Sequence, residues 1–446
     1  MDPSRFQRSK RTCRYPSESA CRVLRRRIKT QGGLKRLTEP MEIFFSVGEP
    51  SGDLHGANLI RALKSRRPDI KCVGYGGPKM AEAGCQLHED LTRWAIMWFL
   101  RAILNLHNFI GLMLRANRYF REHKPDAVVL IDYPGFNWWI AGRAKAHGIP
   151  VFYYGTPQLW AWAEWRVNKM RRLVDHALCK LPFEEAWYRE RDCNATYVGH
   201  PYFDELENQV LDTDFVRQQN ENSTPLVTLL PGSRSQEVSS NLPVFLETAK
   251  KIKAEVPNVR FAIAAFNDKY AAAAFEHVLA SGVEAEVHVD LTPELIHSAT
   301  CCLACSGSVS LELLYHEKPS VVHYKISAFG HWVQSHFRKV KYITLVNLLS
   351  QNKLFYENGY YTYDPDAPGA DEVVFPEYLT YRNRSDDMAR RIAAWLKEPS
   401  STRKTVEQLR ALKQRVVGQG ASSRGAEYIL SHLAQEKRDG QSSKAA

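Results

Sequence analysis

Short, nearly continuous apolar runs alternate with longer stretches of helical character from residue 41 to about residue 200. Runs of this kind are typical of strands buried on both faces, and helices between them predict a parallel sheet covered on both sides. The predicted strands are 42–47, 70–74, 127–131, 150–154, 176–180 and 195–198. We therefore predict a doubly wound α/β domain over residues 41–204.

A polar stretch, residues 205–224, interrupts this rhythm and is predicted to link two domains. The alternation then restarts, with predicted strands at 226–230, 259–264, 285–289, 300–305 and 320–324. It indicates a second Rossmann-like domain over 225–400 that faces the first across a cleft, followed by helices over 401–435. The last residues, 436–446, are polar and are predicted to be disordered.

One segment, residues 94–114 (WAIMWFLRAILNLHNFIGLML), breaks the α/β alternation. Its polar positions Arg101, Asn105, Asn108 and Arg115 fall on one helical face. Charged side chains make a membrane-spanning helix costly, so two interpretations stay open: a helix on an anionic lipid surface, or a helix packed against the first domain. In the lipid-surface case, the expected lipid contacts are Trp94, Met97, Trp98, Phe99 and Phe109.

A net charge of +11 suggests a nucleic-acid partner, but the distribution of this charge along the chain decides whether the suggestion holds. Residues 1–40 hold twelve Lys and Arg against three acids, so this segment carries a charge of +9 and the rest of the chain only +2. We therefore predict a basic, disordered extension over 1–40 and no nucleic-acid partner for the body. The extension lacks the apolar core of a signal peptide.

Nine cysteines without an export signal favour reduced thiols over a disulfide framework. Cys302 and Cys305 have C-x-x-C spacing, but no second pair completes a zinc site. With Cys301 they lie in an apolar run, so we expect buried structural cysteines and no metal.

Two loops that follow strand-like runs carry the candidate chemistry. Residues 48–56 (GEPSGDLHG) follow the first predicted strand and lack the G-x-G-x-x-G fingerprint of dinucleotide sites. In the same domain, Asp132 ends the run AVVLID, where a carboxylate at the carboxyl end of a strand faces the ligand cleft. It is a candidate general base, and the alternative is a turn or helix-capping Asp.

The second loop, residues 231–237 (PGSRSQE), follows strand 226–230 and opens a helix. Arg234 offers paired donors suited to a diphosphate, beside Gly232 and Ser233. Ser306, Gly307 and Ser308 follow another strand, with Glu312 one turn further on. These residues suit phosphate and ribose binding, and the alternatives are helix caps and a surface glutamate.

Collinear motifs over about residues 41–435 resemble the lipid-A-disaccharide synthase family. They are GEPSGDLHGA (48–57), GGPKM (76–80), IDYPGFN (131–137), PQLWAW (157–162), LPFE (181–184), VGHP (198–201) with Asp204, LLPGSRSQEV (229–238), SGSVSLE (306–312), NLL (347–349) and PEYL (376–379). The resemblance implies a GT-B fold, an inverting glycosyltransferase, and no metal or cofactor.

The resemblance also implies the substrates and the site. The expected donor is UDP-2,3-diacylglucosamine and the acceptor 2,3-diacylglucosamine 1-phosphate, which are joined as a β(1→6) disaccharide. Asp132 matches the family's proposed base and Arg234 the arginine near the UDP phosphates. The expected donor-side residues are Ser51, Gly52, Asp53, Gly232, Ser233, Ser306, Gly307, Ser308, Glu312 and Asn347. We expect a peripheral protein on the cytoplasmic face of the inner membrane, with a homodimer left open.

Three departures from the family pattern lie on the acceptor side: Gly135, Ala163 and the stretch 97–103. They leave open a glycosyltransferase of the same class with a changed lipid acceptor. Two further alternatives are a sugar-nucleotide epimerase of the same architecture and a catalytically weakened nucleotide-sugar or lipid-binding homologue.

Overall fold

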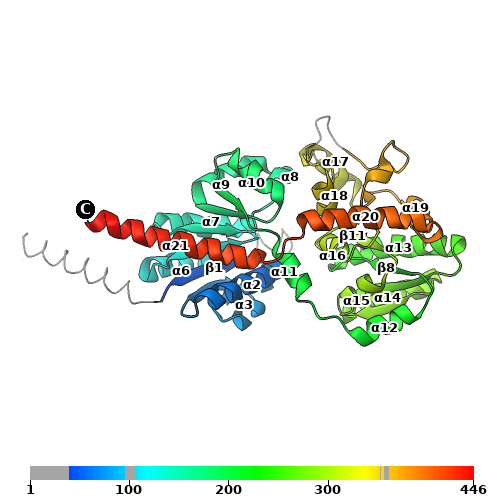
Figure 1. Ribbon diagram of the computed structural model, residues 1–446, viewed down its shortest axis with the longest axis horizontal. Helices are drawn as coiled ribbons and strands as arrows, with labels where there is room; N and C mark the ends of the chain where they lie inside the picture. Colours follow the sequence, from blue (N-terminus) through cyan, green and yellow to red (C-terminus); the bar gives the residue numbers. More distant parts are fainter. Residues whose placement is uncertain (1–39, 96–105, 352, 356–360, 446) are drawn as a thin grey trace, which may run out of the picture.

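The computed structural model describes residues 40–95, 106–351, 353–355 and 361–445, which form two parallel sheets flanked by helices (Figure 1). The first sheet has seven strands in the order β3-β2-β1-β4-β5-β6-β7. Their bounds are β1 Glu42–Val47, β2 Lys71–Gly76, β3 Cys85–Asp90, β4 Ala127–Ile131, β5 Val151–Tyr154, β6 His176–Cys179 and β7 Ala195–Tyr197. Every pairing is parallel, as the buried apolar runs predict, and β3 is an addition to the six predicted strands.

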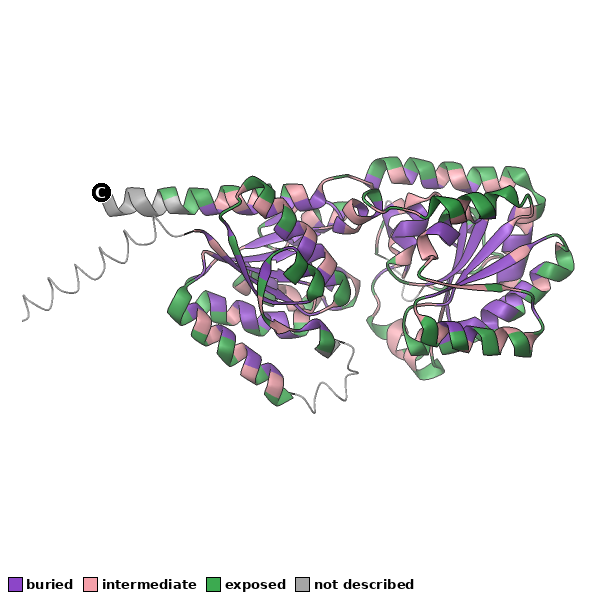
Figure 2. Cartoon of the chain, turned by 90° about the horizontal axis from the view of Figure 1, so that it is seen from below, coloured by how far each residue is buried: buried purple, intermediate pink, exposed green. Residues whose placement is uncertain are grey.

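The second sheet has six strands in the order β10-β9-β8-β11-β12-β13, again all parallel. Their bounds are β8 Leu226–Leu230, β9 Arg260–Ala265, β10 Glu286–Val289, β11 Cys301–Cys305, β12 Ser320–Lys325 and β13 Glu377–Thr380. Five of these confirm the predicted strands, and β13 is an addition. The strands of both sheets are mostly buried, so each domain has its core around its own sheet (Figure 2).

Helices cover both faces of each sheet. In the first domain they are α2 Pro50–Arg66, α3 Pro78–Glu82, α4 Thr92–Ala95, α6 Leu106–His123, α7 Pro134–Ala146, α8 Leu159–Trp162, η1 Glu164–Arg166, α9 Val167–Leu173, α10 Pro182–Arg189 and α11 Pro201–Glu207. In the second they are α12 Thr213–Glu221, α13 Ser235–Glu255, α14 Asp268–Ser281, α15 Thr292–Ser298, α16 Val309–Tyr315, α17 Ala328–Phe337, α18 Leu345–Ser350, η2 Ala370–Glu372, α19 Ser385–Lys397 and α20 Pro399–Val416.

The segment predicted as a linker, 205–224, is largely helical. It contains the end of α11, and it contains α12, whose first backbone N–H groups are capped by the Asp212 carboxylate. Because α12 packs on α15 of the second domain, the chain passes between the domains over the residues from 208 to 212.

The last helix, α21 Ala421–Ala445, returns to the first domain and packs along α2 (Figure 1). Its side chains Ala426, Ile429 and Leu433 are buried in the same core cluster as Leu59 of α2. The prediction that residues 436–446 are disordered is wrong for 436–445, which continue α21.

The apolar segment 94–114 is described only at its two ends. Trp94 lies in α4, while Met97, Trp98 and Phe99 lie outside the described residues. Phe109 of α6 is buried, and its ring packs near those of Tyr133 and Phe136, so it belongs to the core and is not a surface contact. This corrects the prediction of a lipid contact at Phe109, because α6 turns that face toward the sheet.

The opposite face of α6 exposes Leu106, Ile110 and Leu114, which are spaced four residues apart. None of the helices in the described ranges is long and apolar enough to cross a membrane. The cysteine prediction is confirmed: Cys301, Cys302 and Cys305 are buried in β11.

Candidate active site

The loops predicted to bind ligand lie at the point where each sheet reverses its strand order. In the first sheet β1 lies between β2 and β4, and the strand order reverses between β1 and β4. In such a sheet the connections after these two strands lead to opposite faces, and ligands bind in the crevice between them. Glu49 follows β1 and Asp132 follows β4. In the second sheet, the same relation places the loop of Arg234 after β8 and that of Ser306 after β11.

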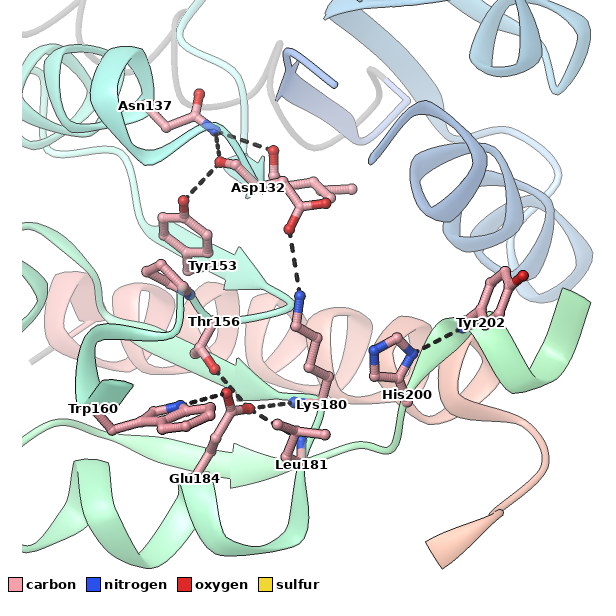
Figure 3. A network of polar contacts seen from close by, with 12 residues as sticks. Asp132, Asn137, Tyr153, Thr156, Trp160, Lys180, Leu181, Glu184, His200 and Tyr202 are labelled. Atoms are coloured by element: carbon pink, nitrogen blue, oxygen red, sulfur yellow. Dashed lines mark hydrogen bonds and ion pairs between the residues drawn. The ribbon is translucent and has the colours of Figure 1, made fainter. Parts of the chain in front are cut away.

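The Asp132 backbone is strained and is held by buried polar side chains (Figure 3). Asp132 and Tyr133 have φ of 47° and 43°, a left-handed conformation that costs about 1–2 kcal/mol per residue. The Asp132 carbonyl accepts hydrogen bonds from Asn137 Nδ2 at 2.7 Å and from the Tyr153 hydroxyl at 2.7 Å. Asn137 is fully buried and is itself oriented by the Ser46 hydroxyl, 2.7 Å from its Oδ1. This network fixes the turn that aims the carboxylate.

The Asp132 carboxylate pairs with Lys180, whose Nζ lies 3.5 Å from Oδ1 (Figure 3). Both side chains are mostly buried, with 13% of Lys180 and 19% of Asp132 exposed. Burial alone would lower the pKa of Lys180, but the Asp132 and Glu184 carboxylates outweigh it and the pKa lies above its ordinary value. Lys180 is therefore a fixed cation beside the candidate base.

Other charged groups converge on this pair. Burial and the Asp132 carboxylate raise the pKa of Glu49, while Lys180 and Arg234 oppose the rise. Because Arg234 belongs to the second domain, its influence on Glu49 indicates that the two switch-point loops approach each other. His55 is buried nearby, and burial lowers its pKa to about 4, so its ring is neutral near pH 7.

Close approach of α2 to Asp132 requires glycine at position 52. A Cβ there would lie 2.9 Å from Val47 Cγ1 and 3.3 Å from the free oxygen Oδ2 of Asp132. Ser51, one residue earlier, is exposed at the start of α2. Gly52 thus borders Asp132.

Asp53 differs from Ser51 and Gly52 because its carboxylate is hydrogen-bonded within the first domain, which corrects the predicted contact of this side chain with the donor. Its carboxylate is buried and accepts hydrogen bonds from the backbone N–H groups of Gly77, Lys79 and Met80 at 2.9–3.1 Å. These groups form the N-terminus of α3, so Asp53 caps that helix and its oxygens are occupied.

In the second domain, Arg234 is exposed over 77% of its side chain, and its Nη1 lies 2.7 Å from Glu237 Oε1. Glu237 Oε2 accepts from the backbone N–H groups of Ser233 and Arg234 at 3.1 and 3.2 Å. Gly232 has φ of 122°, and a Cβ there would collide with Glu237. The N–H groups predicted to be open to a phosphate are therefore engaged by a carboxylate of the same loop.

The loop after β11 leaves its polar groups accessible. Gly307 and Ser308 are exposed, and Ser308 makes no capping hydrogen bond to α16, against the alternative of a helix cap. Glu312 is buried and not a surface residue: its Oε2 accepts from the Tyr202 hydroxyl of α11 at 3.0 Å. Its Oε1 is buried without a hydrogen-bond partner among the described residues. Ser306 is half-buried beside them.

Asn347, predicted on the donor side, uses its side chain within the second domain. The side chain is fully buried and donates to Phe375 carbonyl oxygen at 2.7 Å and to Glu377 Oε2 at 3.0 Å. Its Oδ1 accepts from Phe375 N–H at 2.9 Å. These three hydrogen bonds tie α18 to β13 and to Phe375 just before it.

The acceptor-side departures have different surroundings. A Cβ at Gly135 would meet nothing within 4 Å, so the position borders open space. Ala163 is fully buried, and the nearby Arg166 stacks over Trp162 and Trp165. Among the residues that the structure describes, no cluster of three or more His, Cys, Asp or Glu side chains could hold a metal ion.

Several site residues were not predicted from the sequence: Asn137, Lys180, Glu184 and Glu237. Three of them lie inside motifs already quoted, IDYPGFN, LPFE and LLPGSRSQEV, and Lys180 immediately precedes LPFE. Motif membership could have suggested the first three. For Lys180, only its place at the end of the predicted strand 176–180 offered a signal.

Two doubly wound domains with loops at both switch points define a protein of the GT-B class. A UDP-GlcNAc 2-epimerase from Neisseria meningitidis bound to UDP-GlcNAc shares this fold with a TM-score of 0.58 at 12% identity, covering 88% of this chain and 100% of that one. CalG4, the calicheamicin glycosyltransferase, shares it with a TM-score of 0.53 at 13% identity, covering 89% and 99%.

Within this class, the chain belongs to the lipid-A-disaccharide synthase family. The family model described as lipid-A-disaccharide synthetase matches residues 43–409. A lipid-A-disaccharide synthase from Myxococcus xanthus is 32% identical over 403 residues, covering 89% of this chain and 99% of the relative. One from Coxiella burnetii (strain Dugway 5J108-111) is 34% identical over 310 residues, covering 69% and 81%.

Proposed function

We propose that this chain transfers 2,3-diacylglucosamine from its UDP conjugate to 2,3-diacylglucosamine 1-phosphate, forming a β(1→6) disaccharide and releasing UDP. Family membership over residues 43–409 is the observation that carries the proposal. The geometry agrees with it, since a carboxylate stands at one switch point and an exposed arginine at the other. Family membership favours this function over the epimerase and binding-protein alternatives.

In the proposed reaction, the acceptor's 6-hydroxyl oxygen attacks C1 of the donor sugar. The new C–O bond forms as the bond from C1 to the UDP phosphate oxygen breaks, and UDP leaves with the electron pair. Asp132 takes the hydroxyl proton, because Lys180 holds its Oδ1 and its Oδ2 makes no hydrogen bond with the described residues. Arg234 balances the negative charge that grows on the diphosphate.

The remaining donor contacts are proposed from the place of these residues in the switch-point loops and the helices that follow them. Gly232, Ser233, Ser306, Gly307 and Ser308 would line the phosphates. Glu312 would accept from a ribose hydroxyl through Oε1, the oxygen that lacks a partner. Ser51 and Gly52 would face the donor from the first domain.

We further propose that the protein works as a peripheral protein on the cytoplasmic face of the inner membrane. Both proposed substrates carry acyl chains, and α6 exposes an apolar stripe of Leu106, Ile110 and Leu114 on the first domain. Such a stripe suits shallow insertion among lipid headgroups.

The test is a purified full-length assay with the UDP-diacyl donor and the monosaccharide 1-phosphate, which follows UDP release and identifies the disaccharide by mass. We expect product from the native chain, and loss of turnover with retained UDP binding in Asp132→Asn. Asp192→Asn, an exposed residue paired with Arg171, is the matched control and should stay active. Intact UDP binding without disaccharide would overturn the proposed acceptor, and full activity of Asp132→Asn would exclude the base.

A further inference from the structure

Lys180 reaches the candidate base from a distant part of the chain. It follows β6, whereas Asp132 follows β4, so the lysine crosses the end of β5 to reach the carboxylate. Its stem passes over Gly155, where a Cβ would lie 3.8 Å from Lys180 Cδ. Gly155 has φ of 74°, a conformation that favours glycine, so the end of β5 is shaped by a residue without a side chain.

The lysine backbone is anchored by a buried carboxylate (Figure 3). Glu184 Oε2 accepts from the backbone N–H groups of Lys180 and Leu181 at 3.1 and 3.0 Å. The same carboxylate accepts from Thr156 Oγ1 and Trp160 Nε1 at 3.0 Å each. Four donors hold Glu184, and through it the start of the Lys180 side chain is fixed in one place.

Lys180 offsets negative charge beside Asp132. Glu49 follows β1, and burial and then the Asp132 carboxylate raise its pKa, while Lys180 opposes the rise. The other titratable neighbours do not supply the charge: His55 is neutral near pH 7, and Tyr153 donates its hydroxyl to the Asp132 carbonyl. Arg234 acts from the second domain, and it is paired with Glu237.

We propose that Lys180 is a positioning residue for the base: its ammonium holds Oδ1 of Asp132 and places a positive charge beside the carboxylate, which leaves Oδ2 to accept the acceptor's proton. The inference rests on the proposed function. Lys180 is not the base itself, because its carboxylate neighbours keep it protonated. The proton passes from the acceptor hydroxyl to Asp132, and Lys180 neither gains nor loses one.

The test compares Lys180→Met, which keeps the length of the side chain and removes the charge, with Lys180→Arg, which keeps the charge. Lys145→Met is the matched control, since Lys145 pairs with Asp175 in the same domain at 2.6 Å, away from the cleft. For each full-length protein, kcat/KM is measured from about pH 5 to pH 10, UDP binding is measured by calorimetry, and folding is checked by thermal unfolding.

We expect the acidic limb of the kcat/KM profile to move up by about one pH unit or more in Lys180→Met, as expected for loss of an opposite charge within about 4–6 Å. At pH values below the limb, activity then falls about tenfold for each unit that the limb moves, and it recovers at higher pH, while UDP affinity stays within about twofold. Lys180→Arg should keep the acidic limb of the kcat/KM profile near its native pH, and Lys145→Met should not move this limb.

An unchanged acidic limb in a folded Lys180→Met protein would overturn the inference. So would a loss seen only as a raised KM for the acceptor, which would make Lys180 a substrate-binding residue. Failure of the proposed function gives a separate result, because the native chain would then form no disaccharide at any pH.

Discussion

Glu237 Oε1 lies 2.7 Å from Arg234 Nη1, and the same carboxylate accepts from the N–H groups of Ser233 and Arg234, just before α13. The second domain thus carries its own anion where we propose that the UDP diphosphate binds. For a phosphate to use these donors, the carboxylate must give them up, so binding of the nucleotide and release of Glu237 are linked.

Glu237→Gln should therefore tighten UDP binding, because the amide removes a negative charge that competes with the phosphates. We expect the Kd for UDP, measured by calorimetry, to fall about tenfold, the equivalent of about 1.4 kcal/mol. Glu255→Gln at the far end of α13, where Glu255 pairs with Lys397, is the control and should leave the Kd unchanged. Weaker UDP binding in Glu237→Gln would show instead that the carboxylate orients Arg234 for the nucleotide.

Arg234→Ala should lower kcat by about two to three orders of magnitude, equivalent to about 3–4 kcal/mol, since it removes a preorganised donor from the leaving group. Steady-state UDP release with saturating donor measures this. Arg217→Ala removes another exposed arginine that pairs with an acid three residues away, Asp214, and should retain native turnover. If the two variants lose activity equally, the effect does not come from the site.

Asn137→Ala should destabilise the first domain by about 2–4 kcal/mol, because it strips buried carbonyl groups of their donor beside a strained turn. Urea unfolding gives the value. Tyr153→Phe removes only the hydroxyl that contacts the Asp132 carbonyl and should cost about 1 kcal/mol. Equal stability of the two variants would contradict the network described around the turn.

Asp204→Ala should loosen α21 from the first domain. The Asp204 carboxylate accepts from the N–H groups of Gly420, Ala421 and Ser422 at 2.8–3.0 Å, so it caps α21 from another helix. Loss of the cap costs about 1–2 kcal/mol. Hydrogen exchange should then quicken in α21. The control is Asp212→Ala, which removes the cap of α12 and should quicken exchange in α12 alone. If α21 is equally protected in the Asp204→Ala and Asp212→Ala variants, Asp204 does not hold α21 in place.

The order of strands could be predicted because buried parallel strands are apolar throughout. The two strands that escaped prediction lie at sheet edges: β3 (CQLHED) is largely polar, and β13 is a four-residue strand that begins with Glu377. The helices of 205–224 were missed because the polar composition of this segment resembles a loop, although Asp212 offers a good cap.

The candidate site could be predicted only in part. Asp132 stands directly after β4 and Arg234 in the loop after β8, and strand ends are local features of a sequence. The direction in which a polar side chain points is not a local feature. For this reason Asp53 and Asn347 were expected at the ligand, whereas their side chains are bonded to α3 and to residues 375–377. Lys180 meets Asp132 across 48 residues, a contact that depends on the strand order alone.

The return of α21 to α2 also has a consequence for biosynthesis. A ribosome delivers the strands of the first domain early, yet the helix that covers Leu59 on α2 is encoded after the second domain. Until α21 is translated, the nascent first domain exposes apolar side chains of α2, and it attains its finished surface only after the second domain has emerged. Premature termination after α20 would therefore damage the domain that was made first.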